Sequence, residues 1–245
     1  MKRKIGIFIE ARTGSTRLPG KILKKINSKT SIIEFLIDRI QASLNFKNLI
    51  IITTKKKEDD RIIRLCKKKN ILFFRGSTHD LIKRNLDAAK KFQINDIIQL
   101  TSDNPFIDIN ILKKLKKIYL NKNYEFVSNS VSGTFPIGSD IRIFKVSSLK
   151  KYSIYVKKKF RQHTCYYFLK NSKKINSHDY LAPIRFRNSK IRLTVDYYED
   201  LIFAKKLVSL IGENLKDYTL KNIFRVINKS KNYKINYKKG LKLNI

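Results

Sequence analysis

Acidic residues are scarce in this sequence of 245 residues, because 19 Asp and Glu stand against 55 Lys and Arg, for a formal net charge of +36. A basic excess of this size, taken alone, suggests a polyanionic partner such as nucleic acid. The lysines are nevertheless spread over the whole length, in short runs among many Ile and Asn residues, and no recognised nucleic-acid-binding motif accompanies them. We interpret the charge as a solvated, lysine-coated surface and expect nucleic acid not to be a partner.

Cysteine and long apolar runs are also nearly missing. Cys66 and Cys165 lie far apart without a CxxC pair or a His-rich neighbourhood, which argues against a disulfide framework and a zinc site. The apolar run at residues 5–9 is too short for a signal peptide. No other run approaches the roughly 18 to 20 apolar residues of a spanning helix. We expect a cytoplasmic protein without a membrane segment.

The apolar residues that are present make up 42% of the chain, enough for one α/β domain over residues 1–245. Ser31 and Glu34 form an S-x-x-E capping box, which predicts a helix that begins there. Buried strands and helices alternate through the first hundred residues, which predicts a Rossmann-like, mostly parallel central sheet covered on both faces. The predicted strands are 5–9, 49–53, 71–74 and 97–101, and the further helices lie near 58–69 and 81–91.

The regular alternation is lost in residues 124–190, which are rich in Tyr and Phe and include a strand-like run at 140–144. We interpret this stretch as an inserted subdomain for acceptor binding or dimerisation. A strand is expected again at 191–195 and a helix at 199–211, whereas the last thirty residues are lysine-rich and weakly patterned.

A loop with two glycines and three cations follows the first strand. Ligands of such sheets bind beyond the carboxyl ends of the strands, where this loop lies. Gly14 and Gly20 allow backbone N–H groups to approach an anion, and Arg12, Arg17 and Lys21 supply positive charge, which indicates a triphosphate cradle. A Walker A loop is excluded because five residues separate the glycines and no hydroxyl follows the lysine. An ordinary basic connection is the alternative, which the compact order of Gly, Pro and hydroxyl residues disfavours.

Asp103 and Asp196 stand out in a chain poor in acids, because each follows a predicted strand. Carboxylates of this kind hold Mg²⁺ in nucleotidyl transfer. For Asp103 alone a turn or cap role is the alternative, since Asn-Pro follows it.

The segment 9–23, with the sequence IEARTGSTRLPGKIL, closely resembles the signature of the cytidylyltransferase family that activates acidic sugars such as Kdo and sialic acids, and especially its spore-coat polysaccharide (SpsF-like) branch. Residues 74–77, 100–105 and 192–196 resemble the later blocks of the family in the same order, so the resemblance extends over about residues 5–205. It implies a nucleotide-diphospho-sugar transferase fold, CTP and a sugar or sugar-acid acceptor as substrates, Mg²⁺ as cofactor and a homodimer.

The resemblance also implies roles for individual residues. Lys21, Arg17 and Asp103 are expected to be catalytic, and Asp103 and Asp196 to bind the metal. The expected nucleotide-binding residues are Ala11, Arg12, Gly14, Ser15, Lys21, Arg75 and Thr101, and the expected acceptor-binding residues are Pro136, Gly138, Asp140 and His163.

Three positions depart from the family pattern: Gln162 where Glu is frequent, Ser102 in place of Gly, and Arg142 where an acid is frequent. For His163 a structural role is equally open. The residues themselves do not select the base, so a nucleotidyltransferase for another nucleoside triphosphate is an alternative, and a non-catalytic nucleic-acid-binding protein is another.

Overall fold

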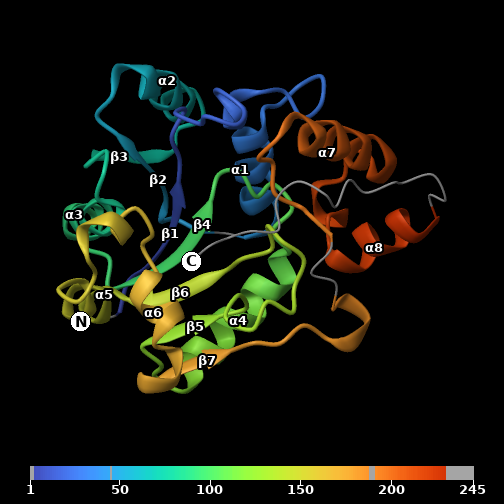
Figure 1. The fold of residues 1–245 in the computed structure, drawn as a ribbon. Helices are drawn as coiled ribbons and strands as arrows, with labels where there is room; N and C mark the ends of the chain where they lie inside the picture. Colours follow the sequence, from blue (N-terminus) through green and yellow to red (C-terminus); the bar gives the residue numbers. More distant parts are fainter. Residues whose placement is uncertain (1–2, 45, 188–190, 230–245) are drawn as a thin grey trace.

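The computed structural model describes residues 3–44, 46–187 and 191–229. Its centre is a seven-stranded sheet in the order β3-β2-β1-β4-β6-β5-β7, shown in Figure 1. The four strands predicted from the first hundred residues are all parallel to one another, and among the strands of the described residues only β6 runs in the opposite direction. The strands are β1 (Ile5–Glu10), β2 (Leu49–Thr54), β3 (Leu72–Gly76), β4 (Asp96–Thr101), β5 (Phe126–Ser128), β6 (Arg142–Lys145) and β7 (Ser177–Asp179). The predicted mostly parallel α/β fold is confirmed.

Helices cover both faces of the sheet. They are α1 (Ile32–Ser43), α2 (Asp60–Lys68), α3 (Leu81–Phe92), α4 (Ile109–Asn121), α5 (Val146–Ser153), α6 (Tyr166–Lys170), α7 (Tyr198–Ile211) and α8 (Leu220–Lys229). Within β1, Ile7 and Ile9 pack into the core cluster that contains α1 and α4, whereas Phe8 packs into the cluster that contains α3 and α5. Successive strand residues point to opposite faces, so a strand buried on both sides needs apolar residues on both, as β1 and β2 have before their polar last residues, Glu10 and Thr53–Thr54.

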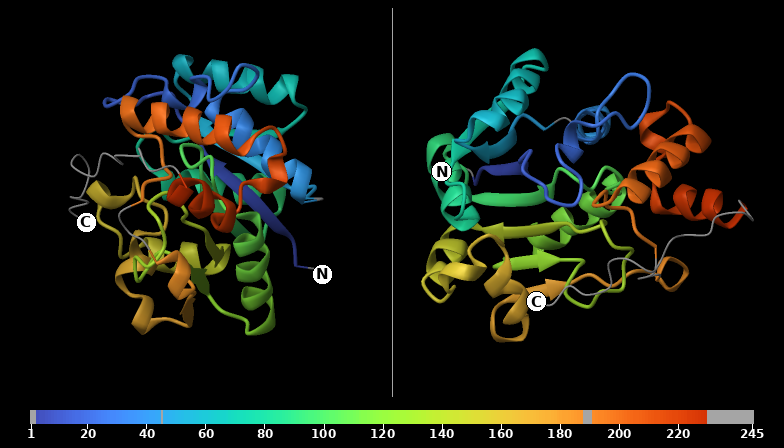
Figure 2. Two further views of the ribbon diagram at one scale, coloured as in Figure 1. Left: turned by 90° about the vertical axis from the view of Figure 1, so that its right-hand side faces the viewer. Right: turned by 45° about the horizontal axis from the view of Figure 1, so that its top comes forward.

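Two further helices, α7 and α8, pack side by side next to the sheet, as the two views of Figure 2 show. They enclose a third cluster with Phe35, Phe106 and Tyr218. Helix α8 lies in the stretch for which the sequence predicted only weak patterning, and that prediction was wrong for residues 220–229. Leu220 and Ile223 are buried three residues apart, and the lysines fall on the exposed side. Residues 230–245 lie outside the described residues.

The capping box at the start of α1 is confirmed, because the backbone N–H of Ser31 donates to the Glu34 carboxylate at 2.8 Å. The predicted strand 191–195 is wrong. This stretch forms one isolated bridge, between Arg192 and Ile137. It has no continuous strand partner, since its backbone bonds go to Ile137 on one side and to the Asp103 carbonyl on the other.

The stretch 124–190 adds β5, β6 and β7 to the central sheet, and the predicted strand-like run at 140–144 corresponds to β6. Its expected roles in acceptor binding and dimerisation stay predictions. Short 3-10 helices connect the larger elements: η1 (Lys21–Leu23), η2 (Lys57–Asp59), η3 (Lys158–Phe160), η4 (Ser172–Lys174), η5 (Ile184–Phe186) and η6 (Leu215–Asp217). Among the described residues, no helix has both the length and the apolar character needed to cross a bilayer.

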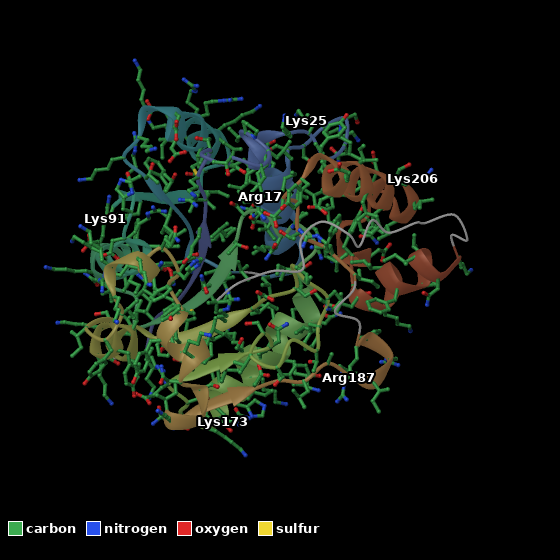
Figure 3. All side chains as sticks on the ribbon, viewed as in Figure 1. Arg17, Lys25, Lys91, Lys173, Arg187 and Lys206 are labelled. Atoms are coloured by element: carbon green, nitrogen blue, oxygen red, sulfur yellow. The ribbon has the colours of Figure 1, made fainter. Side chains whose placement is uncertain are left out.

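The basic residues are distributed over separate elements. In Figure 3 the labelled side chains Lys25, Lys91, Lys173, Arg187 and Lys206 lie around the periphery, whereas Arg17 lies near the centre of the view. The figure therefore shows Arg17, from the loop after β1, apart from basic side chains that are dispersed over the surface.

Candidate active site

A cleft of about 760 Å³ opens where β1 and β4 end. The loop after β1 forms one wall, the start of α3 with residues 162 and 163 forms another, and the segment after β4 forms the floor beside Asp196. The lining residues are Glu10, Ala11, Arg12, Gly14, Ser15, Thr16, Arg17, Lys21, Ile22, Lys56, Glu58, Thr78, Leu81, Arg84, Thr101, Ser102, Asp103, Gln162, His163 and Asp196. Its volume is in the range of clefts that bind a small ligand.

The loop after β1 is held by its own backbone and by a buried carboxylate. Gly20 has φ 63° and donates its N–H to the Thr13 carbonyl at 3.1 Å, which closes the loop. Thr13 donates both its N–H and its hydroxyl to Asp59, and Thr54 donates to the other oxygen of the same carboxylate. Burial alone would raise the pKa of Asp59, but these hydrogen bonds outweigh it and hold that pKa below its ordinary value.

Lys21, at the end of this loop, joins the two acidic candidates. Its Nζ donates to Oδ2 of Asp103 at 2.6 Å and to Oδ1 of Asp196 at 2.8 Å. Asp103 comes from the segment after β4, and Asp196 comes from the extended stretch before α7. Two carboxylates distant in sequence therefore meet at one ammonium group.

Asp196 has two more cationic neighbours. Arg17 contacts its Oδ1 at 2.8 Å and Arg192 its Oδ2 at 3.2 Å. Burial would raise the pKa of Asp196, but the hydrogen bond and charge of Lys21, followed by the charges of Arg17 and Arg192, lower it. Asp200 fixes the local backbone, since it accepts the N–H of Asp196 at 2.9 Å. Asp196 is thus ionised at neutral pH and rigidly placed.

The carboxylate oxygens of Asp103 and Asp196 are of the kind that would hold a magnesium ion. Mg²⁺ prefers oxygen ligands and commonly takes only one or two carboxylates, with phosphates and water completing the shell. In the part of the chain that the structure describes, no group of three or more His, Cys, Asp or Glu side chains could hold a metal. Asp103 and Asp196 would therefore supply two of the oxygen ligands of such an ion, and the remaining ligands would have to come from phosphates and water.

Another wall is held by a partly buried acidic residue, Glu10, at the end of β1. Its Oε1 accepts the Thr164 hydroxyl at 2.6 Å and the Asn85 amide at 3.0 Å. Burial raises the pKa of Glu10, in spite of hydrogen bonds from Thr164, Gln99 and Asn85. Because Thr164 directly follows His163, this contact fixes Gln162 and His163 on the cleft wall.

Residues 6–233 match the family described as cytidylyltransferase. The chain belongs to the cytidylyltransferase family. A cytidylyltransferase structure from Leptospira borgpetersenii serovar Hardjo-bovis is 36% identical, with a TM-score of 0.86 over 93% of this chain and 94% of that one. The spore coat polysaccharide biosynthesis protein SpsF of Bacillus subtilis is 29% identical over 91% of this chain and 93% of its own length. This chain is therefore a nucleotidyltransferase.

A more distant structure supports the fold. The CMP:2-keto-3-deoxy-manno-octonic acid synthetase complexed with CTP has a TM-score of 0.61 at 17% identity, over 84% of this chain and 98% of that one. At this identity the likeness concerns the architecture alone.

Most of the residues expected at the site of this cytidylyltransferase line the cleft. The exception among the nucleotide-binding candidates is Arg75, which does not line it. Its guanidinium donates to the carbonyls of Thr54 and Lys56, at 3.0 and 2.8 Å, and pairs with Asp60 at 2.6 Å. Arg75 therefore supports the loop that carries Lys56 into the cleft. The candidates that do line it are Ala11, Arg12, Gly14, Ser15, Arg17, Lys21, Thr101, Asp103, His163 and Asp196.

The acceptor candidates Pro136, Gly138 and Asp140 do not line the cleft of the cytidylyltransferase either. Gly138 has φ 90°, and a Cβ there would lie 2.3 Å from the Thr194 backbone nitrogen. Asp140 pairs with Arg142 at 2.6 Å. This turn packs against the stretch that leads to Asp196, so the structure gives it a supporting position.

His163 does line the cleft, and its imidazole is held neutral. Burial lowers its pKa below the ordinary 6.5, and the charges of Arg142 and Arg12 lower it further. A neutral imidazole can both donate and accept a hydrogen bond. This property suits contact with hydroxyl groups.

Several lining residues were not anticipated from the sequence, among them Glu10, Lys56, Arg84 and Gln162 as a wall residue. Glu10 had a usable signal, because it is an acid at the end of a strand in an acid-poor chain, like Asp103. Arg84 had none, since it lies within the regular pattern of α3, where it donates to the Ser77 carbonyl at 2.8 Å. Asp59, which anchors Thr13, was missed because its role depends on a contact 46 residues away in sequence.

Proposed function

We propose that this cytidylyltransferase transfers CMP from CTP to a sugar or sugar-acid acceptor, with release of pyrophosphate, for surface polysaccharide or glycan synthesis. The observation that carries the proposal is the meeting of Asp103 and Asp196 at Lys21, directly beside a glycine-containing cationic loop. The similarity to SpsF, and to a synthetase that was solved with CTP, supports the choice of nucleotide and acceptor class.

The loop after β1 supplies the triphosphate contacts in this proposal. Arg12, Ser15, Arg17 and Lys21 line the same wall and offer guanidinium, hydroxyl and ammonium donors. Cations fixed in position stabilise the charge that develops on the leaving pyrophosphate without reorganisation during the reaction. Thr13, bonded to the buried Asp59, keeps this wall in place.

The reaction is an in-line displacement at the α-phosphorus. An acceptor oxygen, which has released any proton to the solvent, forms the new bond to phosphorus, the bond from phosphorus to the bridging oxygen breaks, and the electron pair leaves with pyrophosphate. Asp103 and Asp196 are the residues that would hold Mg²⁺, which when bound neutralises charge on the phosphate oxygens. The chain contributes orientation, because the cleft holds both reactants against fixed donors.

The acceptor is assigned to the wall formed by Gln162 and His163. A neutral imidazole and an amide are suited to the hydroxyl groups of a sugar, since each can donate and accept. The Glu10–Thr164 hydrogen bond ties the residue next to His163 to the end of β1, and both Gln162 and His163 line the cleft. This assignment leaves the wall formed by the loop after β1, with Arg12, Ser15 and Arg17, for the nucleotide.

The test is pyrophosphate release with CTP, UTP, GTP and ATP against a panel of sugar and sugar-acid acceptors, with Mg²⁺ present. CTP should be the preferred donor, and Asp103→Asn should lower the rate by at least about a hundredfold. Asp38→Asn is the matched control, since Asp38 pairs with Lys69 and does not line the cleft. Equal rates in the Asp103→Asn variant, or preference for another nucleotide, would contradict the proposal.

A further inference from the structure

The ammonium of Lys21 lies where a metal ion would have to bind. Its Nζ is 2.6 Å from Asp103 and 2.8 Å from Asp196, and its side chain is only 11% exposed. An ammonium and a divalent ion that each bridge Asp103 and Asp196 compete for the space between the two carboxylates, and their charges repel each other. The two cannot occupy the position between these aspartates together.

We propose that Lys21 is a placeholder for the metal: in the nucleotide-free enzyme its ammonium holds Asp103 and Asp196, and it transfers to the phosphates when the metal and the nucleotide bind. This inference rests on the proposed function, which assigns a triphosphate and a divalent ion to this cleft. It adds that the two ligands bind interdependently, because Lys21 must leave the carboxylates before the ion can enter.

The charges around Asp196 disfavour metal binding in the nucleotide-free enzyme. Besides Lys21, Arg17 and Arg192 contact the same carboxylate at 2.8 and 3.2 Å. Among the described residues, no third His, Cys, Asp or Glu side chain completes a metal-holding cluster with the two aspartates. A divalent ion would enter a position where fixed cations already neutralise the carboxylates. Its interaction with two carboxylates alone does not offset the free-energy cost of removing water from the ion.

A bound triphosphate makes binding of the metal favourable. Its oxygens offer Lys21 and Arg17 new anionic partners within the same cleft, next to Ser15 and Thr16. The lysine stem is flexible enough for Nζ to swing while the backbone stays on η1. The vacated carboxylates and the phosphates together then form an oxygen site. By linkage, the nucleotide strengthens metal binding by the same factor by which the metal strengthens nucleotide binding.

A purely structural salt bridge predicts something different. If Lys21 only held the two segments together, removal of its charge would loosen Asp103 and Asp196 and would not improve metal binding. The placeholder predicts the opposite, because removal of a competitor frees both carboxylates. Metal affinity in the absence of nucleotide therefore separates the two roles.

The experiment is a titration with Mn²⁺, first without nucleotide and then with CTP. Electron paramagnetic resonance monitors the concentration of the free ion. The wild type should bind Mn²⁺ weakly alone and much more tightly with CTP. Lys21→Met should bind Mn²⁺ alone at least about tenfold more tightly than the wild type, and should lose most of the enhancement by CTP.

Lys56→Met is the matched control for a general charge effect. Lys56 lines the same cleft, but its ammonium pairs with Glu58 at 3.8 Å rather than with the aspartates. Its loss should change Mn²⁺ affinity by less than about twofold, as expected for a screened cation. A gain as large as that of Lys21→Met would show simple loss of positive charge and would overturn the placeholder.

Lys21→Met leaves the carboxylates of Asp103 and Asp196 facing each other and could therefore be unstable. Thermal unfolding provides a second readout. Mn²⁺ without nucleotide should raise the melting temperature of Lys21→Met more than that of the wild type. Lys21→Gln serves the same comparison if the methionine variant does not fold. Lys21→Met combined with Asp103→Asn removes the repulsion and should abolish the gain in Mn²⁺ binding.

The outcomes also separate this inference from the proposed function. Equal Mn²⁺ affinities of the wild type and Lys21→Met would overturn the placeholder, even in an enzyme that turns over CTP. Tighter Mn²⁺ binding by Lys21→Met in an enzyme that prefers another triphosphate would support the placeholder and contradict the choice of CTP.

Discussion

The carboxylate of Asp59 accepts two hydrogen bonds from Thr13, one from the backbone N–H and one from the hydroxyl, each 2.7 Å long. Asp59 is fully buried at the start of α2, and Thr13 lies in the loop that forms the cationic wall of the cleft. The contact links the start of a helix that does not line the cleft to the conformation of the loop that does. The placement of Arg12 and Ser15 therefore depends on Asp59.

Asp59→Ala should destabilise the protein by about 1–3 kcal/mol, because buried donors of Thr13 and Thr54 lose their acceptor. Urea denaturation measures this loss, and calorimetric titration with CTP should show weaker binding. Asp60→Ala is the neighbouring control, since Asp60 is partly exposed and pairs with Arg75 outside the cleft. The same CTP affinity in both variants would contradict the anchoring role.

The pKa of Asp59 also gives a pH dependence. Because the folded-state pKa is lowered from 3.8, the stabilisation is complete above that value and is lost as the pH falls through the lower folded-state pKa. Stability curves of the wild type and Asp59→Ala should therefore converge below about pH 3.8. A constant difference down to the acid limit of folding would contradict this cause.

His163 should titrate below 6.5 in the folded enzyme, because burial and the charges of Arg142 and Arg12 disfavour its imidazolium. Arg12→Ala should raise this pKa, as followed by the imidazole proton resonances. Since the folded-state pKa is lowered, the neutral ring contributes stability above pH 6.5 that is lost as the pH falls toward the folded-state value. An unchanged His163 titration in Arg12→Ala would rule out this charge as a cause.

Arg39 should be among the most sensitive positions outside the cleft. Its guanidinium is 1% exposed and donates to the carbonyls of Pro105 and Tyr218, at 2.6 and 2.7 Å. Burial lowers its pKa to about 10, so the group is still charged at neutral pH. Arg39→Met should cost about 2–4 kcal/mol in urea denaturation, because two buried carbonyls lose their donors.

Arg64 provides the control for Arg39, as an exposed arginine on α2. Arg64→Met should change the free energy of unfolding by less than about 0.5 kcal/mol. Because Pro105 lies two residues after Asp103, Arg39→Met should also weaken Mn²⁺ binding in the presence of CTP. A variant as stable as Arg64→Met would contradict the bridging role of the guanidinium.

Gly138→Ala should disturb Asp196 from a distance. A Cβ at Gly138 would lie 2.3 Å from the Thr194 nitrogen, and this backbone cannot yield without moving the stretch that carries Asp196. Gly133→Ala isolates the conformational cost, since Gly133 also has a positive φ, 59°, but no atom within 4 Å of the added Cβ. Both should lose about 1 kcal/mol for the left-handed backbone, and Gly138→Ala should lose more.

Binding separates the two glycine variants further. Gly138→Ala should weaken the combined binding of Mn²⁺ and CTP in calorimetry, whereas Gly133→Ala should bind as the wild type does. Equal stability and equal binding in the two variants would show that the collision with Thr194 relaxes without moving Asp196.

Much of the fold follows from neighbours in sequence. The apolar runs of β1 and β2, the capping box of Ser31 and Glu34, and the glycine-containing loop after β1 are local patterns, and the structure contains each of them. These patterns have a local cause, since the strand period, the helix period and turn geometry depend on residues a few positions apart in the sequence. The sequence by itself thus determined the parallel sheet, the cationic loop and the position of Asp103 at a strand end.

The tertiary structure decided which of these groups act together. Lys21 meets Asp196 across 175 positions, and Glu10 meets Thr164 across 154. The tertiary structure also places Arg75 outside the cleft, where it donates to the Thr54 carbonyl, and residues 191–195 form a single bridge instead of a strand. Such pairings depend on which segments pack side by side, and a charged side chain takes whichever partner the fold brings within reach. That is why the sequence indicated Asp103, Asp196 and Lys21 as separate site residues, but not that the lysine lies between the two aspartates.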